Sequence, residues 1–164
     1  DVCSSDLYKH FTATGHPKGM TSFVITNNSW KVYLLCETND VRSCYIFIDR
    51  TNLQVKDLSK FKTMFRQLGK HCESGMPLTN YYDENDCHYP FTFKYKGKEE
   101  KVWRIRQGNL RLYFVYLPPE KRIILLHVWV KHTDDLSKSE KSSLQKLAKS
   151  VIDDDIASFY RRIL

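Results

Sequence analysis

Six residues in the second half of the chain have side chains suited to work on a phosphate group. They are Arg104, Arg106, Arg111, Tyr113, Lys131 and His132. Arginine and lysine stabilise negative charge on phosphate oxygens, and one guanidinium can bind two oxygens at once. Histidine titrates near neutrality and can carry a proton during a reaction, and tyrosine is a second proton carrier. The set therefore has the charge and the acid–base groups needed to bind a phosphate and move a proton beside it.

The spacing of the basic residues predicts that they lie close together. Residues two apart on a strand share a face, so Arg104 and Arg106 point to the same side. Segment 107–109, Gln-Gly-Asn, predicts a short hairpin that brings Arg111 close across the strand pair. The next predicted strand ends just before Lys131. Four basic side chains are thus expected at one place on the sheet.

Simpler interpretations exist for some of these residues. Arg104 and Arg106 could form a solvated strand face that pairs with acids such as Glu99. His127 lies inside an apolar run, which favours a hydrogen-bonded core histidine over a site residue. Both interpretations can be checked by the burial and the partners of these side chains.

Four consecutive segments are predicted to be the β-strands that position these residues. Apolar and polar residues alternate in the first and third, and the second returns from a Lys-Gly-Lys turn. The fourth contains the apolar run IILLHVWV, typical of a strand buried on both faces. Short turns separate the segments, which favours an antiparallel meander. The segments are Pro90–Tyr95, Glu99–Arg106, Leu110–Tyr116 and Ile123–Val130.

Helical patterns flank these strands. Val55–His71 places its apolar residues on one face and its lysines on the other. Ser137–Glu140 is a capping box, in which the serine hydroxyl accepts from the first helical turn and the glutamate reaches back. Residues 156–164 are expected to form a final short helix anchored by Phe159. These elements predict an α+β domain with a curved antiparallel sheet, a meander of about four strands, flanked by α-helices.

The N-terminal half is predicted with less regular structure. Trp30–Cys36 is expected to be a strand that forms a hairpin with a second strand, Cys44–Ile48, and Cys72–Tyr89 is expected to be a long loop. Residues 1–19 are polar and irregular, as in a disordered tail or a translated sequencing-adapter or cloning scar. Residues 20–164 are expected to form a single domain.

Composition narrows the class of partner. The chain has 164 residues, a formal net charge of +7 and an isoelectric point of about 9.1. Such a charge favours nucleic acid or another acidic partner through long-range attraction. The five cysteines form no Cys-x-x-Cys pair, and their number is odd, which predicts reduced thiols in a cytoplasm. No run approaches the ~18 apolar residues of a membrane span, so no membrane partner is expected.

The sequence lacks the motifs of several other kinds of site. The sequence has no GxxxxGK[ST] phosphate loop and no GxSxG nucleophile elbow. His71-Cys72 and Cys87-His88 are adjacent pairs, whereas zinc sites draw on ligands two to four residues apart, so no metal site is expected. No cofactor-binding motif is present either.

The order of these motifs resembles the RelE/HigB branch of the RelE–ParE toxin superfamily. That branch is typified by an aromatic-x-aliphatic-Arg strand, a glycine turn, Arg-x-x-Tyr, Leu-His-x-Phe-x-Lys-Lys, a polar spacer and a helix. Its parts correspond here to Trp103–Arg106, Gly108, Arg111–Phe114, Leu126–His132 and the helix opened by Glu140. The correspondence covers roughly a third of the chain. Phe114 replaces a usual tyrosine, His132 replaces the second lysine, and Ser137 replaces a common proline.

The resemblance implies a RelE-like toxin domain from a type II toxin–antitoxin system. Its activity would be metal-independent mRNA endoribonuclease cleavage on the ribosome, which inhibits translation, with no cofactor and with a cognate antitoxin as partner. The ribose 2′-hydroxyl would attack the adjacent phosphate, and the 5′-oxygen would leave. Arg106 and Arg111 would bind the phosphate with help from Arg104 and Lys131. His132 or Tyr113 would move the proton.

Two other functions fit the same pattern. A ParE-like protein of this fold would inhibit DNA gyrase and cleave nothing, and would need no proton carrier beside its arginines. A non-toxic phage or mobile-element module would use the same basic surface only to bind nucleic acid. The arrangement of Arg106, Arg111 and His132 separates the nuclease from the first alternative.

Overall fold

The structure is a computed structural model that describes residues 23–153 and 160–164 of the 164-residue chain. The expectations for residues 1–19 and for Phe159 fall outside these described ranges. Within them, no helix combines the length and the apolar composition that crossing a bilayer would require.

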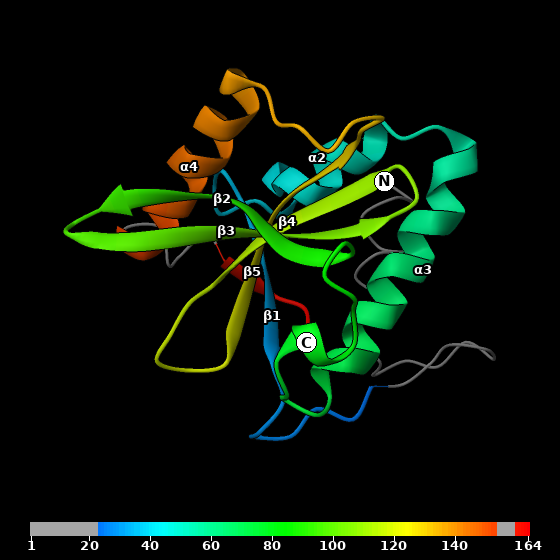
Figure 1. Ribbon diagram of the computed structural model, residues 1–164. Helices are drawn as coiled ribbons and strands as arrows, with labels where there is room; N and C mark the ends of the chain where they lie inside the picture. Colours follow the sequence, from blue (N-terminus) through cyan, green and yellow to red (C-terminus); the bar gives the residue numbers. More distant parts are fainter. Residues whose placement is uncertain (1–22, 154–159) are drawn as a thin grey trace.

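A six-stranded mixed sheet runs through the middle of the molecule, in the order β2-β3-β4-β5-β1-β6 (Figure 1). The pairs β2–β3, β3–β4 and β4–β5 are antiparallel, β1 lies parallel to β5, and β6 is antiparallel to β1. The α+β class is as predicted, but the sheet is wider than the predicted four strands and not purely antiparallel. The strands are β1 Lys31–Leu35, β2 Cys87–Tyr95, β3 Lys98–Gln107, β4 Leu110–Tyr116, β5 Arg122–Val130 and β6 Tyr160–Arg162.

The apolar run of β5 explains why β1 and β6 join the sheet. Residues Ile123, Ile124, Leu125 and Leu126 are all fully buried, which requires neighbours on both edges of the strand as well as on both faces. β4 covers one edge and β1 the other. β6 then pairs with the outer edge of β1. The predicted C-terminal helix is therefore wrong for Tyr160–Arg162, since these residues complete the sheet.

In the part of the chain that the structure describes, three α-helices accompany the sheet: α2 Tyr45–Thr51, α3 Val55–Cys72 and α4 Lys138–Asp153. Single 3₁₀ turns lie at Val41–Ser43 and Leu78–Asn80. The helix predicted at Val55–His71 is confirmed as α3. The strand predicted at Cys44–Ile48 is wrong, because Tyr45–Thr51 is helical. Its aromatic and β-branched residues have high strand propensity, and the burial of Ile46 and Phe47 in the core outweighs that preference.

Two cysteines also depart from expectation. Cys36 and Cys44 form a disulfide, so the prediction of reduced thiols is wrong for this pair. An isolated antiparallel β-bridge joins the same two residues, and the predicted hairpin is otherwise absent from the described residues. Cys72 and Cys87 are free and buried.

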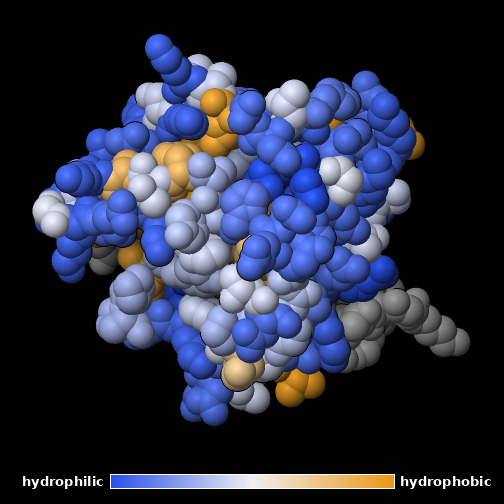
Figure 2. Space-filling view, in the orientation of Figure 1, coloured by the Kyte–Doolittle hydropathy of each residue, from blue (hydrophilic) through white to orange (hydrophobic). Residues whose placement is uncertain are grey.

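The two faces of the sheet carry different helices. α3 packs on one face and α4 on the other, and Figure 1 shows them on opposite sides of the strands. Alternation along β4 divides its residues between the two cores, with Leu112 and Phe114 toward α3, and Tyr113 and Val115 toward α4. The outer surface in the view of Figure 2 is mainly hydrophilic, with its hydrophobic residues gathered mostly over α4 and β2.

The capping box predicted at the start of α4 is confirmed. The backbone N–H of Glu140 donates to the Ser137 hydroxyl at 3.1 Å, and the backbone N–H of Ser137 donates to Glu140 Oε2 at 2.8 Å. This reciprocal pair fixes where the helix begins. It also fixes the length of segment 131–137, which connects β5 to α4.

A β-bulge divides β5 into two halves. Tyr113 pairs with His127 and Phe114 pairs with Leu125, so Leu126 is an extra residue on β5. A bulge of this kind bends the strand and increases its twist. Beyond it, His127 and Trp129 face α4, whereas Val128 faces α3.

Candidate functional site

Six side chains form two rows across the α4 face of the sheet, near the end of β5. Residues that face each other on neighbouring strands share a side of the sheet, and so do alternate residues of one strand. The first row consists of Arg104, Tyr113 and His127, and the second of Arg106, Arg111 and Trp129. The shared face predicted for the arginines is therefore confirmed.

All three arginines reach one carboxylate, that of Asp134 in segment 131–137. Arg111 Nη2 donates to Asp134 Oδ1 at 2.9 Å, and Arg104 Nη1 donates to the same oxygen at 3.2 Å. Arg106 Nη1 donates to Asp134 Oδ2 at 3.5 Å. Arg106 and Arg111 pair directly across β3 and β4, where like charges repel unless an acid is shared. We call Arg104, Arg106 and Arg111 the arginine cluster, which Asp134 occupies.

The arginine cluster is buried at its base and open at its top. The side chains of Arg104 and Arg111 are 2% and 7% exposed, whereas those of Arg106 and Asp134 are 30% and 55% exposed. Buried charges need partners. Arg106 Nε donates to Asp86 Oδ1 at 3.2 Å, and Arg111 Nη1 donates to two carbonyl oxygens at the β3–β4 turn, at 2.6 and 3.1 Å. The guanidinium groups are thus held in fixed positions.

Three buried polar atoms at this place have no hydrogen-bond partner among the described residues. They are Arg104 Nε, Arg111 Nε and the Tyr113 hydroxyl. Unsatisfied buried donors are uncommon in folded proteins. The acids present therefore leave part of the hydrogen-bonding capacity of the cluster unused.

The electrostatics of the cluster favour a bound anion. Partial burial by itself would raise the pKa of Asp134, but the hydrogen bond from Arg111 and the charges of Arg104 and Arg106 outweigh it and lower that pKa. Burial lowers the pKa of Arg104, against the opposing attraction of Asp134. Burial also raises the pKa of the Tyr113 hydroxyl well above its ordinary value. Tyr113 consequently stays protonated at neutral pH and cannot act there as a base.

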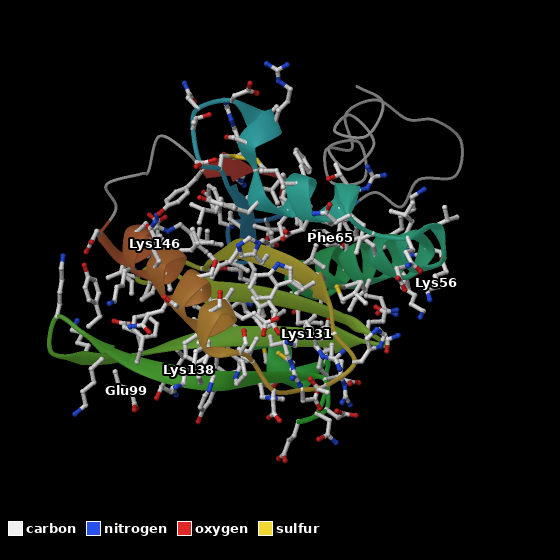
Figure 3. The ribbon with its side chains drawn as sticks, turned by 90° about the horizontal axis from the view of Figure 1, so that it is seen from above. Lys56, Phe65, Glu99, Lys131, Lys138 and Lys146 are labelled. Atoms are coloured by element: carbon white, nitrogen blue, oxygen red, sulfur yellow. A yellow bond between two sulfur atoms is a disulfide. The ribbon has the colours of Figure 1, made fainter. Side chains whose placement is uncertain are left out.

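Lys131 is already engaged by a carboxylate. Its Nζ donates to Glu140 Oε1 at 2.8 Å and to Oε2 at 2.7 Å, and its side chain is 11% exposed. In Figure 3 Lys131 lies near the middle of the molecule, while Lys138 and Lys146 follow α4. Lys131 thus links the end of β5 to the capping box of α4, and its charge is largely neutralised.

His132 lies apart from the arginines. Its exposed side chain lines a small cavity of about 140 Å³ with Gln54, Asp57 and Val130, on the side of α3. Val130 belongs to the opposite face of the sheet, because it pairs with Leu110. Within residues 23–153 and 160–164, no hydrogen bond or ion pair joins His132 to the arginine cluster. The structure does not bring this predicted proton carrier to the predicted phosphate ligands.

His127 is the histidine that shares the face of the arginines. Its Nδ1 lies 2.7 Å from Asp49 Oδ2, and the same oxygen accepts from the backbone N–H of Val128 at 2.9 Å. A carboxylate can only accept, so Nδ1 carries the proton and Nε2 is the basic nitrogen. The ring stacks on Trp129 at 4.6 Å between centroids, with Tyr45 edge-on at 5.2 Å. The predicted hydrogen-bonded histidine is confirmed, but it lies next to Tyr113 in the first row.

Sequence reasoning missed two acids. Asp49 lies in α2, which was predicted as part of a strand region, so its approach to His127 depends on an element that was misassigned. Asp134 follows the end of β5 by four residues, and an acid so near the predicted basic end of a strand was a signal that could have been used. Glu99, the acid suggested as a partner of Arg104 and Arg106, instead accepts from the Thr92 hydroxyl.

A second basic region lies along α4. Lys138, Lys141, Lys146 and Lys149 line a shallow groove of about 770 Å³, with Tyr95 of β2 on its other side. Lys149 lies 5.4 Å from the centre of the Tyr95 ring, and Asp153 accepts from the Tyr95 hydroxyl at 2.6 Å. We call this the lysine groove. No ion pair of these four lysines is found within residues 23–153 and 160–164.

The described residues contain no group of three or more His, Cys, Asp or Glu side chains placed to hold a metal ion. The arrangement offers instead an anion site made of guanidinium groups, with an oriented imidazole in the neighbouring position. No protein-family model matches the chain, and a search of curated proteins finds no match to it either.

Proposed function

We propose that this chain is a RelE/HigB-like toxin, an mRNA endoribonuclease that acts on the ribosome without a metal ion and is held inactive by an antitoxin. One observation carries the proposal: Arg104, Arg106 and Arg111 converge on one anion position, and His127 stands in the row of Arg104, on the same face of the sheet. Phosphate ligands beside a proton carrier are what RNA cleavage by the 2′-hydroxyl requires. The consecutive antiparallel strands and the capped helix that follows them also agree with a RelE-like fold.

The reaction uses the two rows in different ways. The scissile phosphate binds where the Asp134 carboxylate now lies, with Arg106 and Arg111 on its oxygens and Arg104 beneath them. The 2′-hydroxyl loses its proton to His127 Nε2 and its oxygen bonds to phosphorus. The bond to the 5′-oxygen breaks, which leaves a 2′,3′-cyclic phosphate, and the 5′-oxygen takes a proton from solvent. The guanidinium groups stabilise the second negative charge that the phosphorane gains.

Asp49 and Tyr113 support this chemistry without taking part in it. Asp49 holds His127 in the tautomer whose Nε2 is basic. Tyr113 lies between Arg104 and His127 and spaces them. Lys131 adds charge at the end of β5, reduced by its ion pair with Glu140.

A cleavage time course on programmed ribosomes tests the proposal with Arg106→Ala. Arg106 is the most exposed arginine of the cluster, so its removal disturbs the fold least. We expect the cleavage rate to fall about 10²- to 10³-fold, as when one electrostatic donor is removed from an active site. Arg66→Ala, which removes an equal charge from the exposed surface of α3, is the control and should retain the parental rate. A parent that cuts no RNA but stalls DNA gyrase would replace the nuclease by the ParE-like function.

A further inference from the structure

The Asp134 carboxylate fills the arginine cluster incompletely. Its Oδ1 is shared by Arg104 and Arg111, and its Oδ2 is 3.5 Å from Arg106, near the limit of a hydrogen bond. Asp86 also pairs with Arg106, so two carboxylates face three guanidinium groups, and the two almost fully buried arginines share the single Asp134 oxygen Oδ1. A tetrahedral anion has enough oxygens to give each guanidinium its own acceptor.

The segment that carries Asp134 is fixed at its ends and not in its middle. At one end the Lys131 N–H donates to the Asn109 carbonyl at 2.7 Å, and at the other the capping box holds Ser137. Between them, the hydrogen bonds that Asp134 accepts within the described residues all come from the three arginines. Asp134 is also more than half exposed. The carboxylate can therefore leave the cluster without breaking any other hydrogen bond of the segment.

We infer that Asp134 is an internal substitute for a phosphate group, which occupies the arginine cluster of the free protein and is displaced when a phosphate dianion binds. This inference rests on the proposed function in that both use the same cluster. A phosphodiester in its ground state carries one negative charge, as Asp134 does, and gains little by the exchange. A phosphate with two charges, whether a free ion or the phosphorane of the reaction, gains more from three guanidinium groups. Asp134 thus makes the site selective for the transition state over the bound substrate.

Binding of inorganic phosphate measures the exchange directly. The Asp134→Asn protein should bind phosphate at least ~10-fold more tightly than the parent at pH 7.5, by calorimetric titration at constant ionic strength with chloride as the balancing ion, because the competing charged acceptor is gone. Asp135→Asn is the matched control, since it removes an equal charge from the next, exposed residue, and it should bind as the parent does. Equal affinity in the parent and Asp134→Asn, or equal tightening by both variants, would overturn the inference.

A second measurement uses the parent protein, in case Asp134→Asn does not fold. The Nε–H groups of Arg104 and Arg111 have no partner among the described residues, so their NMR signals report on any new anion. Titration with phosphate should shift both signals saturably, and titration with chloride should not. Signals that do not respond to phosphate would contradict the exchange.

RNA cleavage by the same variants separates this inference from the proposed function. Tighter phosphate binding by Asp134→Asn with no cleavage by any variant would keep the anion exchange and remove the nuclease. Cleavage that depends on Arg106, together with unchanged phosphate binding in Asp134→Asn, would keep the nuclease and remove the exchange.

Discussion

The arginine cluster and the lysine groove are both basic, and they differ in everything else. The arginines project from neighbouring strands, two of them are almost fully buried, and all three share one acid. The lysines follow one face of a helix and line an open groove. Guanidinium groups held by strands cannot move apart, so they define a position for an anion. Flexible ammonium groups on a helix define only a region of positive potential.

This difference shows how the net charge of +7 should be interpreted. Solvated side chains such as those of the lysine groove contribute most to the positive field outside the protein, and under the proposed function they would attract RNA from a distance. The arginine cluster contributes little to that field, because its acids neutralise most of its charge. The cluster instead provides a fixed arrangement of guanidinium groups around one anion position. We therefore expect substitutions in the cluster to change chemistry and substitutions in the groove to change association.

The largest effect should come from the histidine beside the cluster. His127→Gln should lower the rate of mRNA cleavage on programmed ribosomes about 10²- to 10⁴-fold, the usual contribution of a general base, while RNA affinity changes little. His132→Gln is the matched comparison, and it should keep the parental rate because His132 lies on the side of α3. If His132→Gln were the slower of the two, the proton carrier would be the residue suggested by the sequence, and the two rows would not be the site.

An intermediate effect is expected in the lysine groove. Replacing Lys141 and Lys146 together by alanine should weaken RNA binding several-fold at low salt, and should reduce the slope of log affinity against log salt by about 1 to 2. The single-turnover cleavage rate at saturating RNA should not change. A Lys56→Ala, Lys62→Ala protein, altered on the exposed side of α3, is the control for charge alone. A lower single-turnover cleavage rate in the groove variant would contradict the distinction between the two regions.

The smallest effect is expected on the folding stability of the protein, at the capping box of α4. This box lies between the arginine cluster and the lysine groove. Glu140→Gln should lower the free energy of unfolding by about 1 kcal/mol, because the ion pair with the mostly buried Lys131 is lost while the glutamine can still accept from the Ser137 N–H. Burial alone would raise the pKa of Glu140, but hydrogen bonds from Lys131 and Ser137 outweigh it and lower that pKa. A lowered folded pKa stabilises the protein above the unfolded value, near 4.3 for glutamate, and this contribution is lost as the pH falls through the folded value.

Urea titrations of the parent and Glu140→Gln across pH 3 to 7 measure that contribution. The difference between the two proteins should be constant above about pH 5 and should shrink below about pH 4. Glu84→Gln, at an exposed position, should match the parent throughout. A difference that grows as the pH falls would mean that the pKa of Glu140 is not lowered by folding.

The parts of the structure that follow local rules could be predicted from the sequence. Alternation fixed the faces of Arg104 and Arg106, the glycine turn placed Arg111 beside them, and the Ser137–Glu140 spacing located the start of α4. Each of these depends on residues within one hairpin or one helical turn. The structure therefore confirms the placement of the arginines on one face and the strands that carry them.

The parts that failed depend on contacts between distant segments. Tyr45–Thr51 has strand-like residues but is a helix because Ile46 and Phe47 fill the core beside β1 and β5. Its Asp49 meets His127 across 78 positions of sequence, which no local pattern reveals. β6 likewise exists because the edge of β1 needs a partner. Local periodicity cannot report such requirements.

The extra residue of β5, Leu126, has a consequence for how such a protein could change over evolutionary time. Deleting it would leave Phe114 opposite Leu125 and Tyr113 opposite His127, so every side chain of the two rows would keep its face. The strand would lose its bend, and with it the local curvature of the surface around the two rows. Insertion or deletion at this one position can therefore reshape the surface without replacing any residue of the site. The curvature of the strand can thus change in evolution while the residues of the two rows stay the same.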